Sequence, residues 1–383
     1  MRRLRVLYLI DNISQSGGAE RAAAALAMSL PHDRFEVWMC STRWADPTAV
    51  AALTESGVRH VHIGRRSKWD VHRLAALVSL VRRQRFDVLH AHLFGSNLWG
   101  TLIGRLCGVP VLIAHEHTWS YEGNPLRKWL DGRVIGRLAT RFVAVSSLDA
   151  ERMVTIEHVP PEKVVMIPNA HVPRPGPVDG DLRQDLHIDN DTPLISVVSV
   201  LRPQKALSVL LDAYSRVLES LPNAHLIIAG DGPCRGELEQ QTRELGLTDK
   251  VHFLGRRTDV DAILSAADVA AMSSDYEGTP LVTYECMANR TPLVATAVGG
   301  LPDVIQDGRT GLLVPPRDPS ALATALICLL TDPVKRERIA AAAAECLPEF
   351  TIEAATQRFA TLYETLAAES GLVSGVTRSA QRA

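Results

Sequence analysis

The sequence has no long apolar run, no closely spaced pair of cysteines and few aromatic side chains. A helix that crosses a membrane needs about 20 consecutive apolar residues, and the nearest approach among these 383 residues is ALATALICLL at 321–330. The six cysteines are scattered and form no CxxC pair, a usage that fits a reducing compartment and offers no cysteine-based metal site. We therefore expect a cytoplasmic protein whose contact with a membrane is at most peripheral, at the inner face.

The first residues predict a strand rather than an export signal. They are basic, but the apolar stretch VLYLI at 6–10 is shorter than the core of a signal peptide, and Asp11 closes it.

The formal net charge of the whole chain is only −2, but the two halves of the chain differ in net charge. Residues 1–176 carry 23 basic and 15 acidic side chains, or +8, and residues 177–383 carry 18 and 28, or −10. This asymmetry predicts that the first half meets an anionic partner, either a membrane surface or a phosphorylated acceptor. A nucleic acid fits poorly, because no aromatic side chains interleave with the basic ones as stacking platforms.

Basic residues cluster beside tryptophan in the first half, at 65–69 and 127–129, and a further cluster lies at 82–85. Around the last tryptophan cluster, Leu126, Leu130, Val134 and Leu138 form an apolar stripe at helical spacing. Such a helix either lies in a membrane interface or packs its stripe on the core of its own domain, and both alternatives remain open at this point.

Short apolar runs alternate with helical patterns in each half, which predicts an α/β fold with two Rossmann-like parallel sheets. We expect strands near 4–10, 35–41, 58–62, 87–91, 110–115, 141–145, 163–167, 194–200, 224–229, 250–254, 268–272, 292–295 and 311–314.

A proline-rich stretch at 168–181 divides the two halves. The predicted organisation is an N-terminal domain (1–170), a linker (171–192), a C-terminal domain (193–350), a terminal helix (351–370) and a tail (371–383). Open parallel sheets bind ligands beyond the carboxyl ends of their strands, so one crevice between the two domains is expected to bind the ligand.

The segment EGTPLVTYE at 277–285 places two carboxylates around a helix start. Pro280 suits the first helical position, and Gly278 lets a ligand approach the backbone, so amides from Gly278, Thr279 and Leu281 face an anion. Glu285 lies about 8 Å along the helix from Pro280. Glu277 and Glu285 could therefore hold opposite ends of a nucleoside-diphosphate sugar. The alternative is a solvated loop glutamate and a surface glutamate.

Three other groups of candidates follow predicted strands. Gly17 and Gly18 form a strand-to-helix turn without the GxGxxG pattern, which argues against an NAD enzyme. His90 and His92 lie on one face of a strand end, and His115 and His117 have metal-ligand spacing with no third ligand beside them in the sequence. Arg202 and Lys205 precede a helix where both cations could reach phosphates.

These motifs resemble, in order and spacing, retaining nucleotide-sugar glycosyltransferases of family 4, which have the GT-B fold of two Rossmann-like domains facing a central cleft. The similar segments are SGGAER (16–21), HAHLFGSN (90–97), AVSS (144–147), IPN (167–169), LRPQKA (201–206), AGDGP (229–233), VHFLGR (251–256), EGTPLVTYE (277–285) and GLLVPPRD (311–318).

The resemblance implies roles for individual residues. His92 contacts the transferred sugar, Lys205 and Arg202 stabilise the leaving diphosphate, Glu277 holds the hexose and Glu285 the ribose. The remaining contacts implied or suggested for substrate are Gly17, Gly18, His117 on the acceptor side, Gly230, Gly232, Phe253, Leu254, Arg256, Gly278, Thr279, Pro280 and Leu281. One departure is Val200, which stands where the family commonly has an arginine, and Arg202 is the candidate replacement.

The expected activity is retaining transfer of a hexosyl or N-acetylhexosaminyl group from a nucleoside-diphosphate sugar to a hydroxyl acceptor. A lipid-linked acceptor and synthesis of a glycolipid, exopolysaccharide or cell-envelope glycan are the expected context. No metal or cofactor is expected, since cations and helix amides meet the developing charge. The alternatives are a nucleotide-sugar 2-epimerase of the same fold and a catalytically silent nucleotide-sugar-binding partner.

Overall fold

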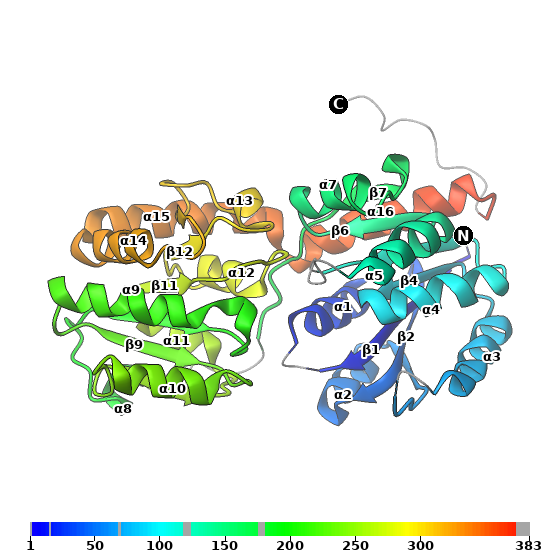
Figure 1. Ribbon diagram of the computed structural model, residues 1–383. Helices are drawn as coiled ribbons and strands as arrows, with labels where there is room; N and C mark the ends of the chain where they lie inside the picture. Colours follow the sequence, from blue (N-terminus) through cyan, green and yellow to red (C-terminus); the bar gives the residue numbers. More distant parts are fainter. Residues whose placement is uncertain (1, 15–16, 68–69, 118–123, 175–180, 373–383) are drawn as a thin grey trace. The chain divides into compact units, whose positions relative to one another are not determined.

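The computed structural model describes residues 2–14, 17–67, 70–117, 124–174 and 181–372. The chain forms two compact units, each of which is described by itself (Figure 1). Unit 1 comprises Met1–Ala170 and Thr351–Ala383, and unit 2 comprises His171–Phe350.

Unit 1 is built on a seven-stranded parallel sheet. Its strands are β1 (Leu4–Ile13), β2 (Phe35–Ala45), β3 (Arg59–His62), β4 (Val88–His92), β5 (Val111–His115), β6 (Arg141–Ala144) and β7 (Val164–Met166), in the order β3-β2-β1-β4-β5-β6-β7. The central strands are apolar along most of their length because helices cover both faces of the sheet. The strand order reverses between β1 and β4, so this pair marks the topological switch point.

The helices of unit 1 connect consecutive strands. They are α1 (Gly18–Ser29), α2 (Pro47–Glu55), α3 (Leu74–Gln84), α4 (Leu93–Leu106), α5 (Pro125–Leu130), α6 (Gly136–Leu138), α7 (Ser147–Thr155) and α16 (Ile352–Glu369), with a π-helical turn at Asp131–Ile135 and short 3-10 turns at Val71–Arg73 and Pro161–Lys163. The predicted continuous helix along the stripe from Leu126 to Leu138 is therefore interrupted by the π-helical turn.

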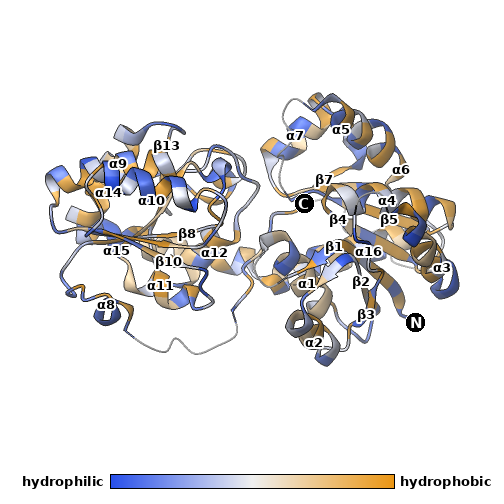
Figure 2. Cartoon of the chain, turned by 60° about the horizontal axis from the view of Figure 1, so that its bottom comes forward, coloured by the Kyte–Doolittle hydropathy of each residue, from blue (hydrophilic) through white to orange (hydrophobic). Residues whose placement is uncertain are grey.

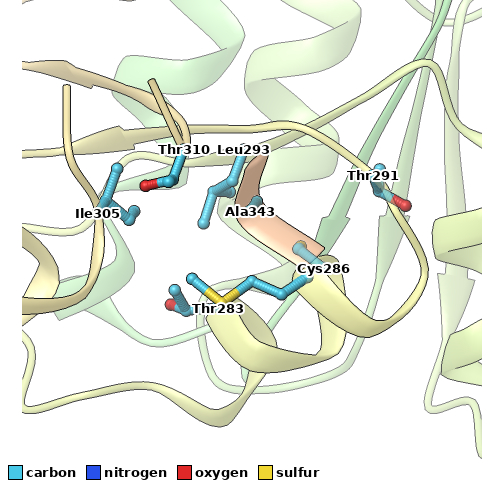
Figure 3. Close-up of a pocket in the computed structure, with 8 residues that line it drawn as sticks. Thr283, Cys286, Thr291, Leu293, Ile305, Thr310 and Ala343 are labelled. Atoms are coloured by element: carbon cyan, nitrogen blue, oxygen red, sulfur yellow. The ribbon is translucent and has the colours of Figure 1, made fainter. Parts of the chain in front are cut away.

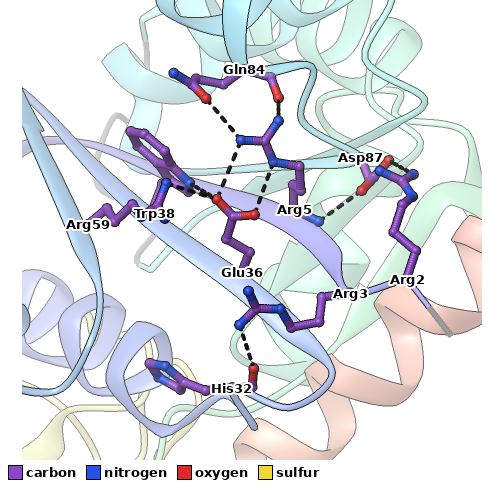
Figure 4. A network of polar contacts seen from close by, with 9 residues as sticks. All are labelled: Arg2, Arg3, Arg5, His32, Glu36, Trp38, Arg59, Gln84 and Asp87. Atoms are coloured by element: carbon purple, nitrogen blue, oxygen red, sulfur yellow. Dashed lines mark hydrogen bonds and ion pairs between the residues drawn. The ribbon is translucent and has the colours of Figure 1, made fainter.

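A polar network ties the amino ends of the strands together at the edge of the sheet opposite the switch-point loops (Figure 4). The Arg5 guanidinium pairs with the Glu36 carboxylate at 3.3 Å. The backbone amide of Arg5 donates to the Asp87 carboxylate at 2.8 Å. Arg59 and the Trp38 indole also bind Glu36, each at 3.1 Å. Several basic residues of the positively charged half are thus engaged in ion pairs within the fold.

The C-terminal helix α16 packs on unit 1, although it follows unit 2 in the sequence (Figure 1). Its face toward the domain is apolar, and Phe359, Tyr363 and Leu366 are buried. The Tyr363 hydroxyl lies 3.0 Å from that of Tyr8 on β1. The helix therefore completes the core of a domain whose other elements come from the start of the chain.

Unit 2 has a six-stranded parallel sheet. Its strands are β8 (Leu194–Val198), β9 (His225–Ala229), β10 (Val251–Gly255), β11 (Val269–Met272), β12 (Leu293–Thr296) and β13 (Leu312–Val314), in the order β10-β9-β8-β11-β12-β13. Orange strands between helices with mixed faces show this layering in Figure 2. The switch point here lies between β8 and β11.

The helices of unit 2 enclose its sheet. They are α8 (Leu182–Asp185), α9 (Leu207–Ser220), α10 (Arg235–Glu244), α11 (Val260–Ala266), α12 (Leu281–Ala288), α13 (Leu301–Val304), α14 (Pro319–Thr331) and α15 (Pro333–Cys346), with 3-10 turns at Pro203–Lys205 and Leu347–Phe350.

All thirteen predicted strands are present, with ends shifted by a few residues. The stretch predicted as a linker differs, because its second part folds onto unit 2. Leu182 and Ile188 are buried there against Leu194 and Ile227. Residues 175–180 of that stretch, Lys68 and Trp69 of one basic cluster, and 373–383 of the predicted tail lie outside the described residues.

We predict that Leu366→Ala destabilises unit 1 selectively, by about 2–5 kcal/mol, because it leaves a cavity under α16. Amide hydrogen exchange should accelerate in β1 and β4 and stay unchanged in unit 2. Val334→Ala, at a side chain that is 79% exposed, serves as the control. Equal acceleration in both units would contradict this assignment of α16.

Candidate active site

The loops after β8 and β11 bring together a buried ion pair at the switch point of unit 2. Lys205 ends the 3-10 turn after β8, and its ammonium donates to Glu277 Oε1 at 2.5 Å. The Ser274 hydroxyl donates to the same oxygen at 2.6 Å. Two of the predicted catalytic side chains are therefore in contact, and their positions follow from the adjacency of β8 and β11.

Arg202 lies in the same loop as Lys205 but is exposed. Burial and the charge of Glu277 raise the pKa of the Tyr276 phenol, and the charge of Arg202 acts in the opposite direction. Val200, at the position where an arginine was expected, is 39% exposed. Of these two positions only Arg202 carries a cation, and its charge acts on Tyr276, which is next to Glu277 in the sequence.

Helix α12 begins one residue later than predicted. It starts at Leu281, and Pro280 is the residue before it, with extended backbone angles. The first amides of the helix still lack partners within the helix, as at every helix start. Gly278, Thr279 and Leu281 are buried around this turn.

Glu285, on α12, is 2% exposed and pairs with Arg174, whose Nε donates to Oε1 at 3.0 Å. Sequence reasoning missed Arg174, because it lies in the proline-rich stretch that resembles a plain linker. Nothing in the local pattern signals this contact.

Glycines hold the loops of unit 2 in close backbone contact. A Cβ on Gly230, whose φ is +145°, would lie 1.7 Å from the carbonyl oxygen of Ser199. A Cβ on Gly299, where φ is +56°, would lie 1.8 Å from the carbonyl oxygen of Glu277. The second contact fixes the backbone of a predicted catalytic residue, and the adjacent pair of glycines at 299–300 is the signal that could have identified it.

The remaining predicted contacts of unit 2 lie on β10 and on the loops after β9 and β10. Gly232 packs against the Leu201 backbone. Phe253 and Leu254 are half-buried and contact the apolar core of the unit, and Arg256 is exposed. Only Arg256 among the last three presents its side chain to solvent.

A pocket beneath α12 is lined by small and apolar side chains and lacks a charged group (Figure 3). The lining residues are Thr283, Cys286, Met287, Thr291, Leu293, Ile305, Thr310 and Ala343. This chemistry does not fit a diphosphate, so we treat the pocket as part of the packing of α12.

At the switch point of unit 1, Gly17 precedes α1 and Gly18 begins it. The Glu20 carboxylate lies over Gly17, because a Cβ there would be 1.9 Å from Glu20 Oε2. A carboxylate thus occupies the start of α1, a position that favours negative charge.

Four buried histidines line the ends of β4 and β5. His92 Nδ1 lies 3.0 Å from His117 Nε2, and His90 Nε2 lies 3.2 Å from His115 Nδ1. Leu93, directly after His92, has a positive φ of 69°, an unfavourable conformation for leucine that is typical of constrained functional turns. Both ring nitrogens of His117 are engaged, since Nδ1 contacts Asn169 Oδ1 at 3.2 Å.

Burial keeps these imidazoles neutral. Desolvation, with a smaller effect from neighbouring histidines, lowers the pKa of His90, His92 and His115 well below the usual range. Burial lowers the pKa of His117 to about 4.

Among the described residues, one group has the geometry to hold a metal ion: ring nitrogens of His90, His92 and His115 lie within 4.8 Å of one another. This group takes only His115 from the predicted His115/His117 pair and adds two histidines from the neighbouring strand β4. A metal would have to replace the hydrogen bond between His90 and His115.

Glu116, between the two histidines of β5, faces other buried acids. Burial raises its pKa well above the usual range, and Asp131, Glu157 and Asp149 raise it further against the opposing effect of Arg127. The pKa of Asp131 rises to about 7 through burial. These carboxyls carry less negative charge near neutral pH than exposed carboxyls would.

Comparison with known proteins assigns the family. Residues 179–345 match the model described as glycosyl transferases group 1, and residues 16–171 match that of Glycosyltransferase Family 4. The D-inositol 3-phosphate glycosyltransferase of Thermomonospora curvata is 31% identical and aligns over 78% of this chain and 78% of its own. The chain belongs to glycosyltransferase family 4. This confirms the resemblance inferred from the motifs, and the enzyme is a hexosyltransferase.

Two further comparisons concern a curated relative of this family 4 enzyme and a solved structure with the same fold. An Escherichia coli UDP-Gal:alpha-D-GlcNAc-diphosphoundecaprenol alpha-1,3-galactosyltransferase is 24% identical over 83% of this chain and 86% of its own. Anabaena HepE, solved in complex with UDP-glucose, has a TM-score of 0.81 and 23% identity, and the match covers 95% of this chain and 100% of that chain. The GT-B prediction of two Rossmann-like domains is confirmed. The relatives named here are transferases and give the epimerase alternative no support.

We predict that Lys205→Met destabilises this glycosyltransferase by about 3 kcal/mol, because it leaves the Glu277 carboxylate buried without its cation. Adding Glu277→Gln to this variant should restore most of the lost stability. Urea unfolding of the wild type, the two single variants and the double variant would measure this in a double-mutant cycle. Strictly additive effects would mean that the pair is not coupled.

Proposed function

We propose that the enzyme transfers a hexosyl or N-acetylhexosaminyl group from a UDP-sugar to a hydroxyl acceptor with retention of configuration. The observation that carries this proposal is the buried Lys205–Glu277 pair beside the start of α12. It combines a cation for a phosphate with a carboxylate for sugar hydroxyls. The Escherichia coli relative is named for UDP-Gal and HepE was solved with UDP-glucose, which supports uridine as the base.

The charge that develops on the leaving diphosphate would be stabilised by Lys205, Arg202 and the first amides of α12. Both described hydrogen bonds to the Glu277 carboxylate go to Oε1, so Oε2 would face the hexose hydroxyls. Glu277 then orients the sugar and is not a nucleophile. The acceptor hydroxyl would attack from the face that the diphosphate leaves, which retains configuration without a covalent intermediate.

Glu285 would hold the ribose hydroxyls, with Arg174 fixing its carboxylate. The glycine turns at Gly230 and Gly232, with the backbone from Phe253 to Arg256, would accommodate the nucleoside. In unit 1, Gly17, Gly18 and His92 would face substrate. No cofactor takes part in this scheme, and protein cations replace a metal.

We predict slow release of UDP from one donor of a panel of UDP-, GDP- and ADP-sugars, unaffected by EDTA. Glu277→Ala and Lys205→Ala should each slow release about 100-fold or more, the typical effect of removing one charge-stabilising contact, while Lys335→Ala should not. Full turnover by Glu277→Ala would refute the site. Nucleotide binding without turnover of any donor, even with acceptor extracts, would favour the silent-partner alternative.

We further propose that unit 1 binds an anionic membrane surface, where it meets a lipid-linked acceptor. Of the apolar stripe, Leu126 is 65% exposed, whereas Leu130, Val134 and Leu138 are half-buried. The neighbouring Trp129 is 56% exposed, so this segment presents apolar side chains to solvent at its start. Helix α4, which packs against the π-helical turn and α6, adds Leu102 and Leu106, 37% and 67% exposed.

Cations lie on the same elements as these apolar side chains. Arg133 and Arg137 are exposed on the same segment. Arg105, Arg141 and Arg137 lie close enough to contribute to the lowered pKa of Lys163, whose main cause is burial. Exposed apolar side chains on segments that also carry exposed cations are typical of surfaces that bind anionic bilayers. Among the described residues, no helix has the length and apolar character to cross a membrane.

We predict binding to vesicles with anionic phosphatidylglycerol and little binding to pure phosphatidylcholine. Arg133→Gln with Arg137→Gln should weaken binding by about 2 kcal/mol, roughly 1 per charge, and Leu126→Ser with Trp129→Ser should abolish it. Val334→Ser, an exposed apolar position in unit 2, is the control. Sedimentation of wild type that is independent of lipid charge would reject the membrane proposal.

A further inference from the structure

The four histidines of unit 1 form two hydrogen-bonded chains that run side by side. In the first chain, Asn169 contacts His117, which contacts His92. In the second, Tyr363 on α16 contacts His90 at 2.6 Å, and His90 contacts His115. Each chain ends in a buried ring nitrogen without a hydrogen-bond partner among the described residues: Nε2 of His92 and Nε2 of His115.

The first chain has a definite direction. The amide oxygen of Asn169 faces Nδ1 of His117, and a carbonyl oxygen only accepts hydrogen bonds. His117 therefore carries its proton on Nδ1. A neutral imidazole has one N–H and one lone pair, so His117 Nε2 accepts, and His92 Nδ1, 3.0 Å away, must donate.

This direction determines the state of the other ring nitrogen of His92. With its proton on Nδ1, His92 presents a lone pair at Nε2. That nitrogen is buried and has no partner among the described residues. An unsatisfied buried acceptor is unfavourable, and a ligand that donates a hydrogen bond to it would remove this penalty.

We propose that Asn169 and His117 are positioning residues that fix His92 in the Nδ1–H form, so that its Nε2 accepts a hydrogen bond from a substrate hydroxyl. The inference rests on the proposed function, because it takes His92 to face the sugar. The group opposite His92 must be a donor, such as a hydroxyl. A carboxylate or phosphate oxygen there would meet a lone pair and be disfavoured. The lowered pKa values of His92 and His117 agree with neutral rings.

His117 thus has a different role from the acceptor contact that its place after β5 suggested. Both of its ring nitrogens are used within the chain. It acts on substrate through His92 and does not touch substrate itself.

Two substitutions at one position separate this role from simple packing. Asn169→Asp keeps an oxygen acceptor toward His117 and should preserve the direction of the chain. Asn169→Leu has a similar volume and no acceptor. His60→Gln, which changes a half-buried histidine of unit 1 outside both chains, controls for general effects on the domain.

The tautomer can be read directly by nitrogen-15 NMR of histidine-labelled, ligand-free protein. We expect His92 in the Nδ1–H form in wild type, in Asn169→Asp and in His60→Gln, and a mixture in Asn169→Leu. With UDP-glucose, or the donor that the release assay selects, kcat/KM should fall about tenfold in Asn169→Leu and stay within threefold of wild type in the other two.

Several results would overturn the proposal. One is an Nε2–H form of His92 in wild type, and another is slower turnover of Asn169→Leu with an unchanged tautomer. Loss of activity in Asn169→Asp equal to that in Asn169→Leu would also count against it. Absence of turnover in wild type would refute the proposed function alone, because the tautomer is measured without donor.

Discussion

The reversal of strand order at the centre of each sheet is the constraint on which the candidate residues of each unit depend. Parallel strands need crossover connections of one hand, so neighbouring strands at the reversal send their loops to opposite faces and leave room at their carboxyl ends. In unit 1, Gly17 lies in the loop after β1, and His92 is the last residue of β4. In unit 2, the loops after β8 and β11 carry Lys205 and Glu277. Within each unit, candidate site residues that are far apart in the sequence lie close together because their strands are neighbours in the sheet.

Much of this arrangement could be predicted from the sequence, since it depends on local patterns. Buried parallel strands are continuous apolar runs, and the glycines and charged residues of the active site stand directly after them. The contact between Lys205 and Glu277 required only the inference that their strands are neighbours. The start of α12 was displaced by one residue, because proline is accepted both at the first helical position and just before it.

The contacts that could not be predicted join distant segments without a local signal. Arg174 reaches Glu285 from a stretch whose composition is typical of a linker, and Asn169 reaches His117 across 52 residues. Likewise, Tyr363 joins His90 only because α16 packs on unit 1. These side chains support the residues that the motifs identify, and they are recognised only when the fold brings them together.

The return of α16 to unit 1 also bears on the order in which the protein is made. Unit 1 is discontinuous in the chain, while unit 2 is one segment whose ends are held together by the hydrogen bond from His171 to Phe350. A ribosome releases all of unit 2 before the helix that fills the core of unit 1 appears. Although unit 1 is synthesised first, its core stays incomplete until the last helix is translated, so the later domain can finish folding before the earlier one.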